Sequence, residues 1–268
     1  MMRWIGRLLS LLLGLALFVT AAAWVAGATV LHDGYLSQVA REQGFYDAAA
    51  KVAPTLLAGS APTGDQGYLT KQLVTPDVIS QTVKPVLDRL PSYYRTGEMP
   101  PRLDLSNLAK QFAPLGVPVP SGLAPFAAGP VSLRNDTLDP PLIKVAGALD
   151  QAQWLGPVSA AVIIVIIAVV TRRRRWRVLS GGFAAGAVFV AIAAGLVTLL
   201  PSLATPSLTT SGLGLLAPAF ESLGTAISRD VSMKLLWWAV GYAGLAVVLA
   251  LITLVSSVRG KGRQHTDA

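Results

Sequence analysis

The sequence predicts an all-α membrane protein with four transmembrane helices and a mainly helical extracytoplasmic domain between the first and second of them. Of its 268 residues, 53% are hydrophobic and only 13% are charged, against about 25% charged residues in soluble domains. Four stretches contain no Asp, Glu, Lys or Arg, namely residues 8–31, 155–171, 178–200 and 235–258. A helix needs about 20 apolar residues to cross the hydrocarbon core, and the apolar face of the segment before residue 155 extends the shortest stretch.

The basic residues predict the orientation of these helices. The net charge is +8, and ten of the 22 Lys and Arg residues, with a single acid, lie in three short segments at 1–7, 172–177 and 259–268. Because Lys and Arg accumulate in cytoplasmic loops, we expect a multi-pass protein of the plasma membrane with both termini in the cytoplasm. The six tryptophans fall near the predicted helix ends, as in an aromatic belt: Trp4, Trp24, Trp154, Trp176, Trp237 and Trp238. The high net charge therefore reflects topology, and nucleic-acid binding is not expected.

The predicted layout has four parts: a cytoplasmic N-terminus with the first helix (1–31), an extracytoplasmic domain (32–153), three further helices with an amphipathic outer loop at 201–234 (154–258), and a cytoplasmic tail (259–268). The first helix has a second interpretation, because Arg3 and Arg7 before the apolar run and Ala26-Gly27-Ala28 near its end are typical of a signal peptide. The apolar run continues for about 24 residues, longer than the usual 7–15, so we expect the helix to be retained.

Helix signals divide the segment at 32–153. Apolar residues at helical spacing run from 33 to 58, with a break near Gly44. Thr75, Pro76 and Asp77 form a helix start, and the helix that follows is expected to end at Pro91. Residues 102–106 alternate as in a short edge strand, with Ser106 capping a short helix. A last helix is predicted from about Pro140 to the arginine cluster.

The outer segment at 201–234 contains an amphipathic stretch. Its apolar residues lie on one helical face: Leu215, Leu216, Ala219, Phe220, Leu223, Ala226 and Ile227. This face either packs against the rest of the protein or lies in the membrane interface. We favour packing, because helices that lie on membranes usually carry more Lys and Arg.

Few residues offer catalytic or metal-binding chemistry. The absence of cysteine excludes disulfides, thiolate ligands and cysteine nucleophiles. The two histidines, His32 and His265, lie far apart in the sequence, and we expect neither a metal nor another cofactor. No ionisable residue lies within a predicted span, which disfavours a proton-coupled carrier. We therefore predict that the protein is not an enzyme, unless acids of the outer domain converge in a polar pocket; the candidates are Asp77, Asp88, Asp104 and Asp139.

Two sets of residues are candidate sites in the membrane region. The glycines Gly182, Gly186, Gly195, Gly241 and Gly244 have the small side chains that let helices approach closely, and Gly182 and Gly186 form a GxxxG pair. We expect packing within one bundle, with homo-oligomerisation as the alternative. The densest positive run comprises Arg172, Arg173, Arg174, Arg175 and Arg177. We expect it to fix the topology, and binding of anionic lipid headgroups is compatible with that role.

A stretch of about thirty residues carries a resemblance to a known group. Thr75-Pro76-Asp77, Gln81, Leu90, Tyr94-Arg95-Thr96-Gly97 and Asp104-Leu105-Ser106 resemble a segment of uncharacterised bacterial integral membrane proteins. In that group a helical extracytoplasmic region lies between a first membrane helix and three later ones. The resemblance implies a bacterial origin and an envelope location, and no activity.

Three functions follow, in decreasing order of expectation. Because each predicted cytoplasmic segment has ten residues or fewer, any signal must pass through a partner. The first hypothesis is a non-enzymatic envelope protein whose domain at 32–153 binds a protein partner, in an assembly, accessory or adaptor role. The alternative is a transporter or channel component that acts as an oligomer, and an extracytoplasmic enzyme comes last.

Overall fold

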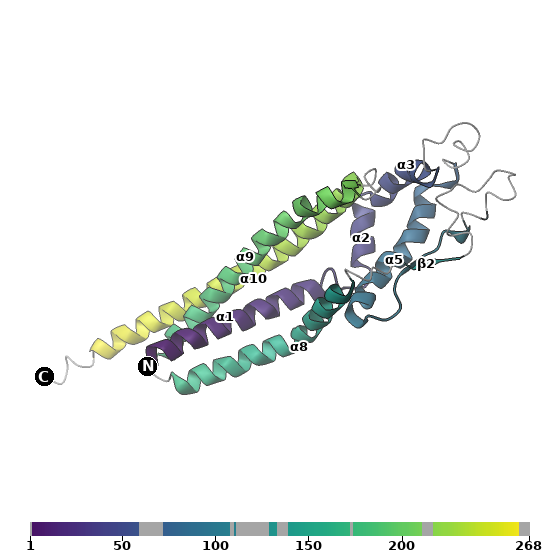
Figure 1. Ribbon diagram of the computed structural model, residues 1–268. Helices are drawn as coiled ribbons and strands as arrows, with labels where there is room; N and C mark the ends of the chain where they lie inside the picture. Colours follow the sequence, from purple (N-terminus) through teal and green to yellow (C-terminus); the bar gives the residue numbers. More distant parts are fainter. Residues whose placement is uncertain are drawn as a thin grey trace. The chain divides into compact units, whose positions relative to one another are not determined.

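The computed structural model describes residues 2–58, 72–107, 110, 129–132, 139–171, 174–210 and 217–262. Within them the chain forms seven helices and two short strands (Figure 1), in the order α1 (Met2–Gly27), α2 (Tyr35–Glu42), α3 (Phe45–Ala58), α5 (Pro76–Thr96), β1 (Arg102–Leu103), β2 (Val131–Ser132), α8 (Asp139–Val170), α9 (Arg175–Thr210) and α10 (Ala217–Gly262). The chain divides into two compact units. Unit 1 comprises Met1–Gly27, Ala148–Thr198 and Asp230–Ala268, and unit 2 comprises Ala28–Gly147 and Leu199–Arg229.

Four of the helices are long and apolar enough to cross a membrane. The candidate spans are Trp4–Gly27 in α1, Asp139–Val170 in α8, Arg175–Leu199 in α9 and Pro218–Val255 in α10. The prediction of a helical chain with four such spans is therefore confirmed. The single helix predicted from about Pro140 to the arginine cluster is also confirmed, because α8 runs without interruption from Asp139 to Val170.

The segment at 201–234 differs from the predicted outer loop. Helix α9 continues to Thr210, and α10 begins at Ala217 and contains the amphipathic residues from Ala219 to Ile227, whereas Leu215 and Leu216 lie outside the described residues. Ala219 and Leu223 of α10 are buried in the hydrophobic core of unit 2. The interpretation that this face packs against its own protein is confirmed. Its position at the start of a long helix was not predicted from the sequence.

The core of unit 2 brings α2, α3, α5 and the start of α10 together. Its buried residues are Ala40, Phe45, Tyr46, Ala49, Ala50, Val74, Ile79, Ala219 and Leu223. The ring of Phe45 contacts that of Phe220 edge-on, with centroids 5.4 Å apart. Between α2 and α3, Gly44 has a φ of 64°, a conformation that favours glycine, and the predicted break lies at this residue.

Helix α5 starts where predicted and ends later. The hydroxyl of Thr75 accepts a hydrogen bond from the N–H of Val78 (3.4 Å), and Pro76 occupies the first turn. The predicted end at Pro91 is wrong, because Pro91 lies buried inside the helix. A proline removes one helical hydrogen bond, and the packing of Pro91 and Tyr93 in the interior of unit 2 offsets that loss. The helix ends at Gly97, whose φ is 74°.

The predicted edge strand at 102–106 is present as a two-residue element. Strand β1 pairs with β2 in antiparallel fashion, with Arg102 opposite Ser132 and Leu103 opposite Val131. Where Ser106 was the expected cap, the carboxylate of Asp104 accepts a hydrogen bond from the N–H of Ser106 (2.9 Å).

In unit 1, α1 is the most enclosed of the four apolar helices. About 39% of its most apolar 18 residues are buried, compared with 28% or less for the same stretch of the other three. Leu13, Leu17 and Ala21 recur on one helical face and lie in the core of unit 1 with residues of α8, α9 and α10. This contribution of α1 to the core supports the expectation that α1 is retained and not cleaved as a signal peptide.

Candidate functional site

Two of the predicted packing glycines lie where α9 meets α1. A Cβ atom added at Gly182 would lie 2.6 Å from Cδ2 of Leu13, and one at Gly186 would lie 3.2 Å from Cβ of Leu17. A Cβ at Gly14 of α1 would lie 2.7 Å from Cβ of Ala185. At Gly14 the added atom would also meet backbone atoms of α9, so the helices would have to separate, whereas at Gly182 and Gly186 the leucine side chains would have to shift. Glycine therefore allows this packing distance.

The α1 side of this contact was not identified from the sequence. Gly6, Ser10 and Gly14 recur every four residues, which places three small side chains on one face of α1. A Cβ at Gly6 would lie 3.3 Å from Cγ2 of Val178, and one at Gly181 would lie 2.7 Å from Oγ of Ser10. The spacing of four between these small residues was the sequence signal for this contact. It matches the spacing of the GxxxG pair of α9.

The other three glycines are placed differently. For Gly195, Gly241 and Gly244, no atom of the described residues lies within 4 Å of an added Cβ, beyond their own helix and chain neighbours. A role for them in helix packing, including contacts between two copies of the chain, stays a prediction.

Two hydrogen bonds within unit 1 join α10 to its neighbours. The hydroxyl of Tyr242 donates to the carbonyl oxygen of Leu17 in α1 (3.1 Å), and that of Ser180 in α9 donates to the carbonyl oxygen of Ala246 (2.9 Å). Hydrogen bonds between apolar helices of this kind are worth about 0.6 kcal/mol on average. They orient α10, and the apolar contacts supply most of the packing.

The arginine run extends from the turn after α8 into the first turn of α9. Arg172 and Arg173 lie outside the described residues. Arg174, Arg175 and Arg177 are exposed, and the guanidinium carbon of Arg175 lies 5.1 Å from the ring centroid of Trp176. This is a cation–π distance.

The acids proposed for an enzyme site do not form one group. Asp77 is exposed in the first turn of α5, and Asp139 accepts a hydrogen bond from the buried hydroxyl of Tyr93 (2.8 Å). Hydrogen bonds from Ser106 lower the pKa of Asp104. Among the described residues, no three or more His, Cys, Asp or Glu side chains come together in a way that could hold a metal ion.

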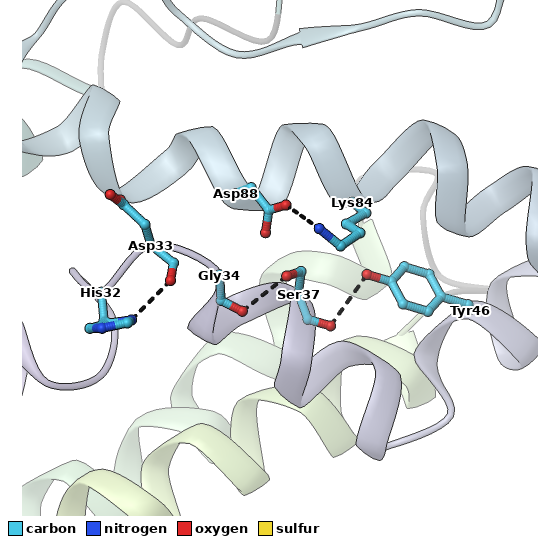
Figure 2. A network of polar contacts seen from close by, with 7 residues as sticks. All are labelled: His32, Asp33, Gly34, Ser37, Tyr46, Lys84 and Asp88. Carbon is cyan, nitrogen blue, oxygen red and sulfur yellow. Dashed lines mark hydrogen bonds and ion pairs between the residues drawn. The ribbon is translucent and has the colours of Figure 1, made fainter.

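A polar cluster joins α2 and α5 in unit 2. Figure 2 shows Asp88 and Lys84 of α5 facing Ser37 of α2. Lys84 donates to Oδ2 of Asp88 (2.6 Å), and Tyr46 donates to the carbonyl oxygen of Ser37 (3.4 Å). The Ser37 hydroxyl donates to the carbonyl oxygen of Gly34 (2.9 Å), which leaves the buried Oδ1 of Asp88 without a partner among the described residues. Rotation of this hydroxyl lets it donate to Asp88 instead.

The surroundings of Asp88 act on its pKa in opposite directions. Burial raises it, whereas the hydrogen bond and positive charge of Lys84, and the hydrogen bond that a rotated Ser37 hydroxyl donates, lower it; the net effect is a lowered pKa. For Tyr46, burial and the negative charge of Asp88 both raise the pKa. The cluster therefore stabilises an ionised Asp88 and a neutral Tyr46 at neutral pH.

This cluster predicts a pH-dependent contribution to stability. An aspartate whose pKa is lower in the folded state stabilises the fold above its unfolded pKa of about 4, and this contribution is lost as the pH falls through the lower, folded pKa. We expect a double-mutant cycle of Lys84→Gln and Asp88→Asn to give a coupling of about 0.5 kcal/mol at neutral pH. Thermal unfolding of the whole chain in detergent micelles measures it. A coupling that does not change on acidification would contradict an ionic origin.

The C-terminal end of α5 carries a second group of contacts in unit 2. Arg95 donates to Oδ1 of Asp33 (2.9 Å), and Nδ1 of His32 donates to the carbonyl oxygen of Asp33 (2.9 Å). Burial and the nearby Asp139 raise the pKa of Tyr94. Exposed ion pairs of this type contribute less than about 1 kcal/mol each, so these contacts position the end of α5.

The chain has no significant match among family models, curated protein sequences or solved structures. Its function is therefore argued from its own residues.

Proposed function

We propose that the protein is a multi-pass protein of a bacterial plasma membrane, with both termini in the cytoplasm, whose unit 2 lies outside the cell and binds a protein partner. The charge asymmetry supports the orientation, because ten of the 22 basic residues fall in the three predicted cytoplasmic segments. The sequence resemblance around Thr75–Ser106 supports the bacterial origin.

The single observation that carries partner binding is the presentation of Met99. Its side chain is 84% exposed, and its φ of 50° is uncommon for a residue other than glycine. Two residues further along, Pro101 is fully buried, which fixes the loop on that side. Non-glycine residues held in this backbone conformation cluster at functional sites, and Met99 presents its apolar side chain from such a position.

The kind of side chain presented here also suits a partner. Methionine is enriched in protein interfaces because its flexible, polarisable side chain adapts to a partner. The exposed Met99 side chain therefore suits an apolar patch on another protein.

Photo-crosslinking in intact cells tests this proposal. A photoreactive amino acid at Met99 is expected to give one major adduct with another protein, and one at Lys51, an exposed residue of α3, is expected to give none. Equal labelling at both positions, or no protein adduct at Met99, contradicts the proposal.

An oligomeric transporter or channel component is the second candidate. It is favoured by Gly195, Gly241 and Gly244, whose small faces meet nothing in the described part of the chain and would suit a second copy. In the same experiment, an adduct with twice the mass of the chain would favour this candidate over a separate partner.

A further inference from the structure

Helices α1 and α9 of unit 1 run parallel with their N-terminal ends at the same level. Three contacts connect them in rising order along both helices: Gly6 with Val178, Ser10 with Gly181, and Gly14 with Ala185. An antiparallel pair would match rising numbers on one helix with falling numbers on the other. The N-terminal turn of α1 therefore lies beside the N-terminal turn of α9.

This parallel arrangement gathers positive charge at one end of unit 1. Arg7, one residue after the first contact, is exposed, as are Arg174, Arg175 and Arg177. The ion pairs found in the described residues join Lys84 with Asp88, Arg95 with Asp33 and Lys234 with Asp230, and these arginines take part in none of them. The aligned dipoles of two helix N-termini add further positive potential.

Among the described residues of unit 1, no acid lies near this end to compensate the charge. Its acidic residues, within the part that the structure describes, are Asp150 and Asp230. Asp150 lies 20 residues before the end of α8 at Val170, which is about 30 Å along the helix. Asp230 lies 16 residues before Ala246, the residue that contacts Ser180 of α9, or about 24 Å along α10. Both distances exceed the Debye length of about 8 Å at physiological salt.

The residues around the arginines indicate that the anion bound by them is a lipid headgroup. Arg175 stacks on Trp176, and Trp4 at the start of α1 is exposed; tryptophans are favoured at the headgroup level of a bilayer. Below them, α1 exposes an apolar face with Leu8, Leu12 and Leu15, against which an acyl chain could lie. A soluble anion would use the arginines alone and leave this face unused.

We propose that the N-terminal ends of α1 and α9 form a binding site for the headgroup of an anionic phospholipid, with Arg7, Arg174, Arg175 and Arg177 around its phosphate. Guanidinium groups suit this ligand because their planar donors bind phosphate oxygens in pairs. The site rests on membrane insertion of the four spans and is independent of what unit 2 binds.

Native mass spectrometry of the purified chain in micelles tests the site, because orientation in a membrane does not matter there. Offered phosphatidylglycerol and phosphatidylcholine together, the wild-type chain is expected to retain phosphatidylglycerol in preference. Arg175→Gln with Arg177→Gln should lower this preference about tenfold, and the matching Lys variants, which keep the charge and lose the paired donors, should lower it several-fold. Arg41→Gln with Lys51→Gln, exposed positions of unit 2, removes the same charge and should change nothing.

Three results would overturn the proposal. Equal retention of the two lipids by the wild-type chain would show that no anionic site exists. An unchanged preference in the Gln or the Lys variants, with thermal unfolding like that of the wild type, would show that these guanidinium groups do not form it. Displacement of phosphatidylglycerol by an equal concentration of glycerol phosphate would show that the site takes a soluble phosphate and not a lipid.

Discussion

Replacing Phe45 with alanine is expected to lower the free energy of unfolding of unit 2 by about 3–5 kcal/mol. The Phe45 side chain is only 6% exposed, and its ring contacts those of Tyr46 and Phe220 edge-on, at 5.9 and 5.4 Å. The substitution leaves a cavity where α3 meets the start of α10, and it removes two aromatic contacts. Hydrogen exchange of the whole chain in micelles, followed over residues 45–58 and 217–229, measures the loss.

The matched control for Phe45→Ala is Lys51→Ala in the same helix. Lys51 is exposed, and alanine is a good helix former, so we expect a change within about 0.5 kcal/mol. If Phe45→Ala increases exchange in α3 and leaves residues 217–229 unaffected, the start of α10 does not depend on this core, and its assignment to unit 2 is wrong.

Gly14→Leu is expected to have the second large effect, on unit 1. An added Cβ alone would lie 2.7 Å from Cβ of Ala185 and 3.0 Å from the backbone nitrogen of Gly186. Since backbone atoms on α9 cannot rotate away, the two helices must separate, and overpacking of this kind costs about 1–3 kcal/mol or more. We expect a lower unfolding temperature in micelles, together with loss of the Tyr242 contact to the carbonyl of Leu17 in α1.

Gly244→Leu is the control for Gly14→Leu, because an added Cβ at Gly244 meets no atom of the described residues. It introduces the same side chain into an apolar helix without a clash inside the chain. If both variants destabilise the chain equally, α1 and α9 do not pack more tightly at Gly14 than α10 packs at Gly244. If Gly244→Leu instead changes the oligomeric state in size-exclusion chromatography, this glycine face contacts a second copy.

The packing of α1 bears on the signal-peptide interpretation. A signal peptide is recognised by its charge and hydrophobicity, and it has no need of contacts with the chain that follows it. Here Gly14 fits against Ala185, Leu13 is fully buried, and the carbonyl of Leu17 accepts a hydrogen bond from Tyr242. Retention of the helix stays a prediction, and these contacts support it.

Local signals predicted several element boundaries well. Thr75-Pro76 marks the start of α5, Gly44 marks the break between α2 and α3, and α8 begins at Asp139. Each of these depends on the conformational preference of one to three residues, which is a property of the chain itself. The end of α5 was missed because Pro91 is a local stop signal that burial in the core outweighs.

The clusters of side chains had no comparable signal. Ser37 and Asp88 are 51 positions apart, and Asp139 and Tyr93 are 46 positions apart. No spacing rule connects such residues, because the fold of the intervening chain decides whether they meet. The same holds for Met99, whose apolar character is visible in the sequence and whose exposure is not.

The sequence by itself determined that the chain has four apolar spans, because the transfer of side chains from water to hydrocarbon is a sum over neighbouring residues and needs no partner. The predicted orientation also places the first and third spans in parallel, with their arginines at the same end. Only the tertiary structure decided that α1 packs directly against α9, with Gly14 against Ala185. That contact depends on the fit of two helix surfaces whose residues are more than 160 positions apart. Neither helix determines the fit alone, so no local pattern in the sequence predicts it.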